Sequence, residues 1–416
     1  MSAKKNAFAP YFMWFLPLSF FAYQFILRLW PGLMMQNIMA QFAIEASGFG
    51  TLAAFYYYGY ASMQIPTAML LDRFGTRLII GFFALVCGLS TLCFTYTQNF
   101  YVALASRFLV GAGSAVGFLG VSKVISEWFP KEHYARMVGL SFTFGLLGAI
   151  YGGKPVYLLI EKYGWQEVAV TLSIISIVIG LTSYVFLHSP QGHVQQTEPT
   201  TTLRWADFKI LIRSPVMWSL ALANLLMVGA LEGFADVWGV RYLMQTFTLN
   251  KGDAAGLISF IFLGMLVGGP LLAFFAKKYG NYKVIAASGL GLALSFVLLL
   301  KQSFYNSYML IALFFVVGIF CCYQVIVFAA GADWVSPQQL GVTVALLNGM
   351  NMLGGSFFHT LIGWIMDWLC SGNQAVDGIK NYDLTAYKYS LSIIPICATI
   401  GVILIWLIGF HVRKRA

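Results

Sequence analysis

Long apolar runs separated by short polar stretches make up most of this chain. Twelve of the runs hold the roughly 20 apolar residues that an α-helix needs to cross a bilayer. They cover residues 12–40, 48–71, 78–97, 100–124, 134–160, 167–187, 216–245, 253–275, 284–301, 306–330, 341–369 and 388–410. Only the connection 188–215 is long; it is polar and ends in an amphipathic segment. The pattern predicts an all-α membrane protein with twelve transmembrane helices.

The linker divides these spans into six and six, and the two halves resemble each other. Glu127 aligns with Asp333, and Glu161 with Asp367, at the same offset of 206 residues. Two copies of a six-helix unit predict two bundles related by a pseudo-twofold axis, with a site between them. The predicted parts are an N-terminal bundle (1–190), a cytoplasmic linker with an amphipathic segment (191–215) and a C-terminal bundle (216–416).

The composition favours lipid as the main solvent. Of the 416 residues, 59% are hydrophobic and 10% are charged, whereas soluble domains carry about 25% charged residues. The mean hydropathy is +0.77. The six cysteines lie in apolar runs, and only Cys321 and Cys322 are adjacent, so we expect neither a disulfide framework nor a metal site. No motif of enzyme chemistry appears, and we expect no enzyme activity and no cofactor.

Lysine and arginine gather in the loops that would share one side of the membrane with both termini. By the positive-inside rule this side is cytoplasmic. The loops account for the net charge of +10, and no basic patch with interleaved aromatic residues suggests nucleic acid as a partner. The first apolar run is too long for the core of a signal peptide, so we interpret it as the first membrane helix. Short loops favour a bacterial inner membrane, and we expect a monomer.

One short loop carries three charges between two spans. In Met69–Arg77, MLLDRFGTR, Gly75 supplies backbone freedom for the reversal, and Gly280 aligns with it at an offset of 205. The acid can bond the N-terminus of a neighbouring helix, and the arginines can pair with acids at other helix ends. Alternatively these charges only set the topology. The predicted cytoplasmic gate comprises Asp72, Arg73, Gly75, Arg77, Glu127 and Asp333.

Three segments resemble motifs of the major facilitator superfamily. MLLDRFGTR resembles the signature loop between its second and third helices, SRFLVGAGSA (106–115) its fourth-helix motif, and RWADFKILIRSPVMW (204–218) its entry to helix seven. The resemblance covers the whole chain and implies a secondary transporter with alternating access. Two features depart from the family pattern. Lys277 stands where the second copy of the loop would carry an acid, and the fifth run, GLLGAIYGGKPVYLLI, does not reproduce the antiporter motif.

Arg28 lies within the first span, just before Pro31 and Gly32. A charge at this depth is costly unless it faces water or a partner. Arginine can hold a carboxylate or phosphate through two parallel hydrogen bonds, and Tyr23 and Gln24 lie about one turn earlier. The resemblance implies a substrate arginine in helix one, as organic-anion members often have. A structural ion pair with the seventh helix is the alternative.

Glu232 and Asp236 lie four residues apart in the seventh span, so they share a helix face. Two carboxylates this close cannot both ionise cheaply, and one should bind a proton. We predict that the pair couples transport to protons and that Arg28 pairs with Glu232 when the site is empty. The alternative is permanent neutralisation of both acids by Arg28 and Arg241.

Two further basic residues interrupt apolar runs. Lys154, in the outer half of the fifth span, can reach substrate or extend outward to water. Arg107 belongs to the fourth-helix motif, and the resemblance implies a role in proton transfer. A structural role remains open for it.

Aromatic and amide side chains complete the candidate site, although a buried amide more often bonds a neighbouring helix. His359 is a lone histidine in an apolar run, which is more often packed than functional. The additional substrate-binding candidates are Tyr57, Tyr60, Gln64, Gln324, Asn348 and Asn351.

We expect a rocker-switch transporter for a small polar solute with a carboxylate or phosphate: an amino acid, a short peptide or an organic acid. Proton symport is the preferred coupling. A facilitative uniporter is one alternative, and an efflux antiporter for amphipathic cations, dependent on Glu232 but not on Arg28, is another. A membrane receptor or scaffold with the same fold, which would not transport, is a hypothesis of a different class.

Overall fold

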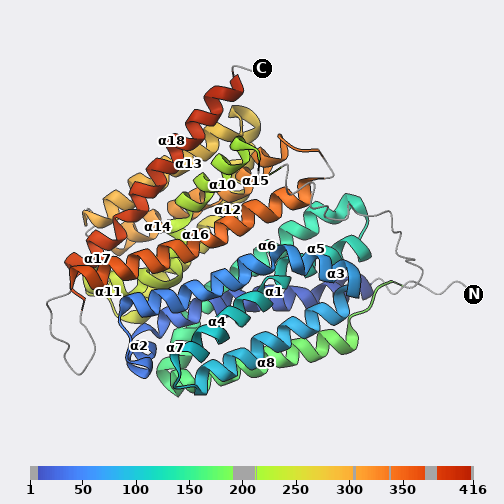
Figure 1. Cartoon of the computed structure of the whole chain (residues 1–416), viewed down its shortest axis with the longest axis horizontal. Helices are drawn as coiled ribbons and strands as arrows, with labels where there is room; N and C mark the ends of the chain where they lie inside the picture. Colours follow the sequence, from blue (N-terminus) through green and yellow to red (C-terminus); the bar gives the residue numbers. More distant parts are fainter. Residues whose placement is uncertain are drawn as a thin grey trace, which may run out of the picture.

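The computed structural model describes residues 8–190, 211, 213–302, 306–336, 339–370 and 382–413. Across this part of the chain every regular element is a helix and no strand occurs. The helices form two bundles that lie side by side (Figure 1). Most of the predicted linker, residues 191–210 and 212, lies outside the described residues.

The first bundle contains six spans, three of them interrupted. Its elements are α1 (Ala9–Leu33), α2 (Met35–Phe42), α3 (Ala46–Tyr96), α4 (Phe100–Ser114), α5 (Val116–Trp128), α6 (Lys131–Gly152), α7 (Lys154–Tyr163) and α8 (Trp165–Phe186). The pairs α1–α2, α4–α5 and α6–α7 each make one span with a break at a single residue, such as Met34 or Gly153.

The second bundle follows the same plan. Its elements are α10 (Pro215–Met227), η1 (Val228–Ala230), η2 (Leu231–Trp238), α11 (Gly239–Phe247), α12 (Lys251–Tyr279), α13 (Asn281–Leu300), α14 (Ser307–Cys321), α15 (Tyr323–Ala332), α16 (Leu340–Leu369), α17 (Leu384–Leu391) and α18 (Ile393–Arg413). The break between α14 and α15 at Cys322 lies at the position equivalent to the break between α4 and α5 at Ala115.

The prediction of twelve spans is confirmed. Eleven helical stretches of the described chain are long and apolar enough to cross a membrane. One of them, α3, has 51 residues, so it is about 77 Å long at 1.5 Å per residue, more than twice the hydrocarbon thickness of roughly 30 Å. It is interrupted at Gly75, whose backbone is not helical (φ 80°, ψ 162°). The chain reverses there, and α3 provides two spans.

Gly75 adopts a conformation that is nearly restricted to glycine. Gly280, its partner in the aligned second half, has almost the same dihedrals (φ 91°, ψ 150°) and joins α12 to α13. Both turns therefore use the freedom of a residue without a Cβ atom, and the backbone agrees with the sequence repeat at this position.

The bundles meet mainly through α3 with α16, α6 and α7 with α12, and α1 with η2. We call the end of the molecule opposite both termini the far end; α2, α7, α11 and α17 lie there (Figure 1). The other end, which holds Gly75, is the termini end. The located contacts between the bundles, such as Gly50 with His359, Gly363 with Ala46 and Lys154 with Asp253, lie in the halves of these helices nearer the far end, so this end is closed.

Glycine allows this close approach. A Cβ atom on Gly50 of α3 would lie 2.2 Å from the carbonyl oxygen of His359 in α16, and one on Gly363 would lie 2.4 Å from that of Ala46. Gly32 of α1 rests in the same way on the carbonyl of Asp236, at 2.4 Å. Backbone meets backbone at these three positions, as is common where membrane helices pack closely.

Replacing Gly75 by alanine should lower the stability of the protein through backbone strain alone. No atom lies within 4 Å of the added Cβ position, whereas the dihedrals cost about 1–3 kcal/mol for a residue other than glycine. We expect a lower midpoint of thermal unfolding for Gly75→Ala in detergent. Gly139→Ala is the matched control, because Gly139 is helical and also has nothing within 4 Å. Equal midpoints in both variants would contradict this account.

Candidate functional site

Helix seven is irregular where its two acids lie. The span begins as α10, tightens to the 3-10 turn η1 and then widens to the π-helix η2, which carries both Glu232 and Asp236. Gly229 and Gly233 face Phe358 of α16, and a Cβ atom at either glycine would lie 3.0 Å or less from that side chain. Segments of π-helix are rare and are frequently found at functional sites.

Arg28 of α1 crosses from the first bundle to both acids of the second. Its Nη1 lies 3.1 Å from Glu232 Oε2, and its Nε lies 3.0 Å from Asp236 Oδ2. The hydrogen bond to Asp236 runs from Nη2 to Oδ1 at 3.4 Å, and the guanidinium also lies over the ring of Phe25. The predicted pairing of Arg28 with Glu232 is thus present. Asp236, which the prediction did not pair with Arg28 in the empty site, shares the same guanidinium, and the three residues form a buried cluster that joins the bundles.

Tyr57 of α3 brings a fourth polar group to this cluster. Its hydroxyl lies 2.7 Å from Glu232 Oε2 and also contacts Asp236 Oδ2. A phenol has one hydrogen to donate, so it cannot bond two ionised carboxylates at once. If one acid carries a proton, that acid can donate to the phenol oxygen while the phenol donates to the other. With one such proton, Arg28, Glu232, Asp236 and Tyr57 have no net charge.

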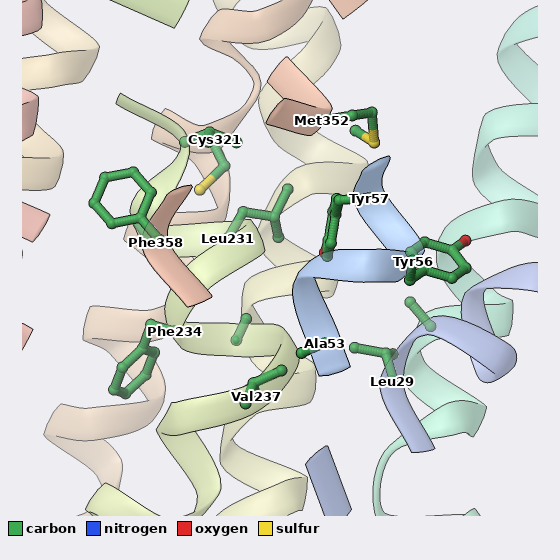
Figure 2. Close-up of a cluster of buried hydrophobic side chains, with 14 of the residues drawn as sticks. Leu29, Ala53, Tyr56, Tyr57, Leu231, Phe234, Val237, Cys321, Met352 and Phe358 are labelled. Carbon is green, nitrogen blue, oxygen red and sulfur yellow. The ribbon is translucent and has the colours of Figure 1, made fainter. Parts of the chain in front are cut away.

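Apolar side chains from both bundles enclose these groups. Figure 2 shows Leu231 and Met352 near Tyr57, with Phe358 beyond Leu231 and Leu29 on the other side. Glu232 is 1% exposed and Asp236 3%. A carboxylate left without a partner at this depth is costly, which makes the ion pairs a condition for closing the far end.

Arg107 of α4 is the second buried arginine near the cluster. Its Nη1 donates to the carbonyl of Leu27 at 3.0 Å, and its guanidinium lies over the ring of Tyr56. No carboxylate of the described residues lies within ion-pair distance of it. The hydroxyl of Tyr56 in turn donates to Gln24 Oε1 at 3.2 Å. This arginine therefore supplies positive charge that no acid neutralises directly.

The other residues of the predicted site are divided between two regions. Tyr60 and Gln64 are buried on α3, one and two turns from Tyr57 toward the termini end. On the second bundle, Asn351 donates to Gln324 Oε1 at 3.3 Å. This leaves the amide nitrogen of Gln324 and the oxygen of Asn351 without a partner among the described residues. Asn348 is half-buried on α16 one turn earlier.

Two predicted substrate residues are placed differently from expectation. The hydroxyl of Tyr23 donates to the carbonyl of Leu172 in α8, so it bonds within the first bundle. Lys154 pairs with Asp253 Oδ1 at 2.9 Å, and both side chains are about half exposed. The flexible stem of lysine reaches the far end from the break before α7, where water stabilises its charge, and Lys154 links the bundles there.

The predicted gate residues at the termini end have partners within their own bundles. Asp72 pairs with Lys123 of α5 at 2.7 Å and not with a helix N-terminus. Arg77 donates to the carbonyl of Tyr184 in the last turn of α8 instead of pairing with an acid, and its guanidinium lies over that residue's ring. The remaining contacts join Arg73 to the ring of Phe74, Ser189 to Glu127, and Asn281 to Asp333.

Asp367 forms a latch at the far end that the sequence reasoning had not assigned. Its carboxylate accepts hydrogen bonds from the backbone amides of Ala46, at 3.2 Å, and Ser47, at 2.8 Å, in the first turn of α3. Tyr382 donates to the same carboxylate. Burial raises the pKa of Tyr382, as does its bond to Asp367, so the phenol keeps its proton. The sequence signal that pointed to this residue was the alignment of Asp367 with Glu161, which lies on α7, a helix that contacts α12 of the other bundle.

A small cavity lies beside the cluster, on its far-end side. It has a volume of about 20 Å³ and is lined by α1, α6, η2 and α12, including Gly32, Gly153, Asp236 and Ser259. This is about the room for one water molecule, too little for a solute. A solute therefore cannot pass between the two bundles at this position while the far end is closed.

Two related helical bundles with buried ion pairs between them are the layout of a secondary membrane carrier. The family model of the Major Facilitator Superfamily matches residues 15–250 and again 237–416. The chain therefore belongs to the major facilitator superfamily and is a membrane transporter, as its motifs predicted.

The similar proteins of known name have low sequence identity to this chain, but the alignments cover most of its length. The chain is 23% identical over 372 residues to the "Probable galactarate/D-glucarate transporter GudP" of Escherichia coli (strain K12), covering 80% of this chain and 82% of the relative. It is also 23% identical to the "Probable L-galactonate transporter" of the same organism, covering 80% and 77%. A solved bacterial homolog of the human lysosomal transporter Spinster, inward-facing and occupied, has a TM-score of 0.75 at 17% identity and covers 97% of both chains.

Removing Arg28 should destabilise the protein, and removing the charges of the two acids as well should restore much of the lost stability. Arg28→Ala leaves two buried carboxylates without their cation, which costs about 3–5 kcal/mol, so we expect a large fall in the unfolding midpoint. The triple variant Arg28→Ala/Glu232→Gln/Asp236→Asn should recover much of that loss. Strictly additive losses in these variants would contradict the ion pairs.

Asp367→Ala should open the far end more than Asp253→Ala does. The carboxylate of Asp367 holds charge-assisted bonds to amides, worth about 1.5–3 kcal/mol each, whereas an exposed pair contributes about 0–1 kcal/mol. Spin labels at Tyr101→Cys and Tyr308→Cys, both 78% exposed near the far end, report the separation after Cys93→Ser removes the exposed cysteine. A longer distance population should grow in Asp367→Ala. Its absence would argue against the latch.

Proposed function

We propose that this transporter is a proton-coupled symporter of small organic acids. The observation that carries the proposal is the position of Arg28: one guanidinium is shared by two buried acids that it can exchange for a substrate carboxylate. While both acids are ionised they occupy the arginine. A proton on either acid weakens the ion pair between that acid and Arg28. N–H groups of the guanidinium then become available to bind an incoming carboxylate.

Charge balance supports a link between proton and anion. Arg28 and Arg107 bring two positive charges, and Glu232 and Asp236 bring two negative charges when ionised. One proton makes the site positive by one unit, and one carboxylate returns it to neutrality. In a low-dielectric site this balance favours binding both together, and by linkage each ligand raises the affinity for the other.

The names of the relatives favour the organic acid among the predicted solutes. Galactarate, D-glucarate and L-galactonate all combine carboxylates with hydroxyl groups. We infer that Arg28 and Arg107 hold a carboxylate of such a solute and that Tyr60, Gln64 and Gln24 bond its polar groups from the first bundle. Gln324, Asn348 and Asn351 serve the same role from the second bundle.

The orientation follows from the distribution of basic residues. We infer that the termini end faces the cytoplasm and the far end faces outside, in a bacterial inner membrane. The structure closed at the far end then corresponds to the state that exchanges with the cytoplasm. Transport alternates this state with one in which the Asp367 latch and the cluster separate and the predicted gate around Gly75 closes. We propose that a monomer suffices for this cycle.

A facilitative uniporter is the second candidate, because Arg28 and the two acids also serve as a purely structural pair. In that case solute crosses without following the proton gradient. A non-transporting receptor with this fold has little support, since the relatives are transporters. Efflux of cations would depend on Glu232 and not on Arg28.

Uptake into liposomes tests the proposal. With acid outside and alkaline buffer inside, the protein should accumulate L-galactonate or D-glucarate above the level reached without a gradient. Arg28→Ala should abolish uptake, and Glu232→Gln should remove the response to the gradient. Arg136→Ala, an exposed arginine at the termini end, is the matched control and should transport normally. Equal accumulation by Glu232→Gln and the parent would remove the acid pair from the mechanism.

A further inference from the structure

His359 of α16 is a buried polar side chain that the proposed site does not use. It is 0% exposed, and neither ring nitrogen has a hydrogen-bond partner among the described residues. Leaving a buried donor or acceptor unpaired costs about 1–3 kcal/mol. Most buried polar groups are bonded, and an exception calls for an explanation.

The position of His359 suggests one. Its ring lies 5.3 Å from the ring of Tyr57, centroid to centroid. On α16 it lies one turn beyond Gly355, against which the Tyr57 ring packs, and two turns before Asp367. It therefore lies between the carboxyl cluster and the latch that closes the far end.

The surroundings of the imidazole change when the far end opens. Its own backbone carbonyl rests on Gly50 of α3 in the closed state, so separation of α3 from α16 admits water at this residue. The titratable and charged groups around it are Tyr57 from α3, whose ring it contacts, and Arg107 from α4 and Arg28 from α1, whose charges act on it. Glu232 and Asp236 of η2 contact the hydroxyl of the same Tyr57. None of these acids bonds the ring, so a positive charge on it would be unpaired while the site is closed.

We propose that His359 relays protons from the far end to the Glu232–Asp236 pair, an inference that rests on the proposed proton symport. When the far end is open, a ring nitrogen takes a proton from water and an N–H bond forms. On closure that N–H bond breaks as an O–H bond forms on one carboxylate, directly or across the Tyr57 hydroxyl. The imidazole returns to its neutral form, and the proton stays on the acid pair.

This role explains why an unpaired histidine is kept where an apolar residue would pack at no cost. Imidazole is the side chain that accepts and releases protons most readily near neutral pH. A residue that served packing alone could be leucine, which has a similar volume. Loss of the imidazole should therefore raise stability and harm coupling, and these two effects separate a relay from a packed side chain.

The test compares His359→Leu, His359→Gln and the parent, with His133→Gln as the control, because His133 is exposed at the termini end. Each full-length protein is placed in liposomes with L-galactonate as the probe. We expect His359→Leu to unfold at a higher temperature than the parent. In both variants, gradient-driven uptake should fall about tenfold or more, while exchange of L-galactonate at equal pH should stay within about twofold, since exchange needs no net proton transfer. His133→Gln should match the parent.

Gradient-driven uptake at the parent level by either His359 variant would overturn the relay alone. A parallel loss of uptake, exchange and stability in both variants would also overturn it, because that result assigns His359 a structural role. A parent that exchanges L-galactonate but never accumulates it would overturn the proposed coupling, and the relay with it. If His359→Leu does not fold, the prediction of higher stability is wrong and His359→Gln decides the question of coupling.

Discussion

A single guanidinium between two carboxylates organises this protein. Arg28 belongs to the first bundle, and Glu232 and Asp236 to the second, at distances of 3.0–3.1 Å from it. Separating the far halves of the bundles while all three groups are charged would break these ion pairs and leave buried charges without partners, which is costly. The ion pairs therefore hold the far halves together. Any ligand that replaces one of them, a proton on an acid or a carboxylate on the arginine, acts on the contact between the bundles as well as on the local site.

The helices around the cluster are shaped for this contact. The π-helix η2 carries both acids, and Gly32 lets α1 rest directly on the carbonyl of Asp236. Tyr57 reaches across from α3 and offers one hydrogen to two acids, a geometry suited to a carboxyl pair that holds one proton. Farther out, Asp367 binds the first turn of α3. The far end is thus held closed by the charged cluster around Arg28, by the Asp367 latch, and by backbone contacts between the two.

The sequence was sufficient for the fold because span length and the repeat depend only on local hydrophobicity. It also singled out Arg28 and the two acids as candidates, since charges within apolar runs are few, and the structure brings these three residues together. It left alternatives open where a side chain's direction depends on tertiary packing. Tyr23 bonds α8, Lys154 reaches the far end, and Asp72 meets Lys123; their sequence spacing is compatible with either outcome. The latch at Asp367 was missed because its partners are backbone amides, which leave no mark in composition.

The central claim is that a proton and a carboxylate bind the same buried charges cooperatively. The most direct measurement is the affinity of the purified protein for L-galactonate as a function of pH, by calorimetry in detergent. If a proton must join the acid pair for the anion to bind, the dissociation constant should rise about tenfold per pH unit on the alkaline side. An affinity that does not change with pH, in a protein that binds the anion through Arg28, would contradict the account.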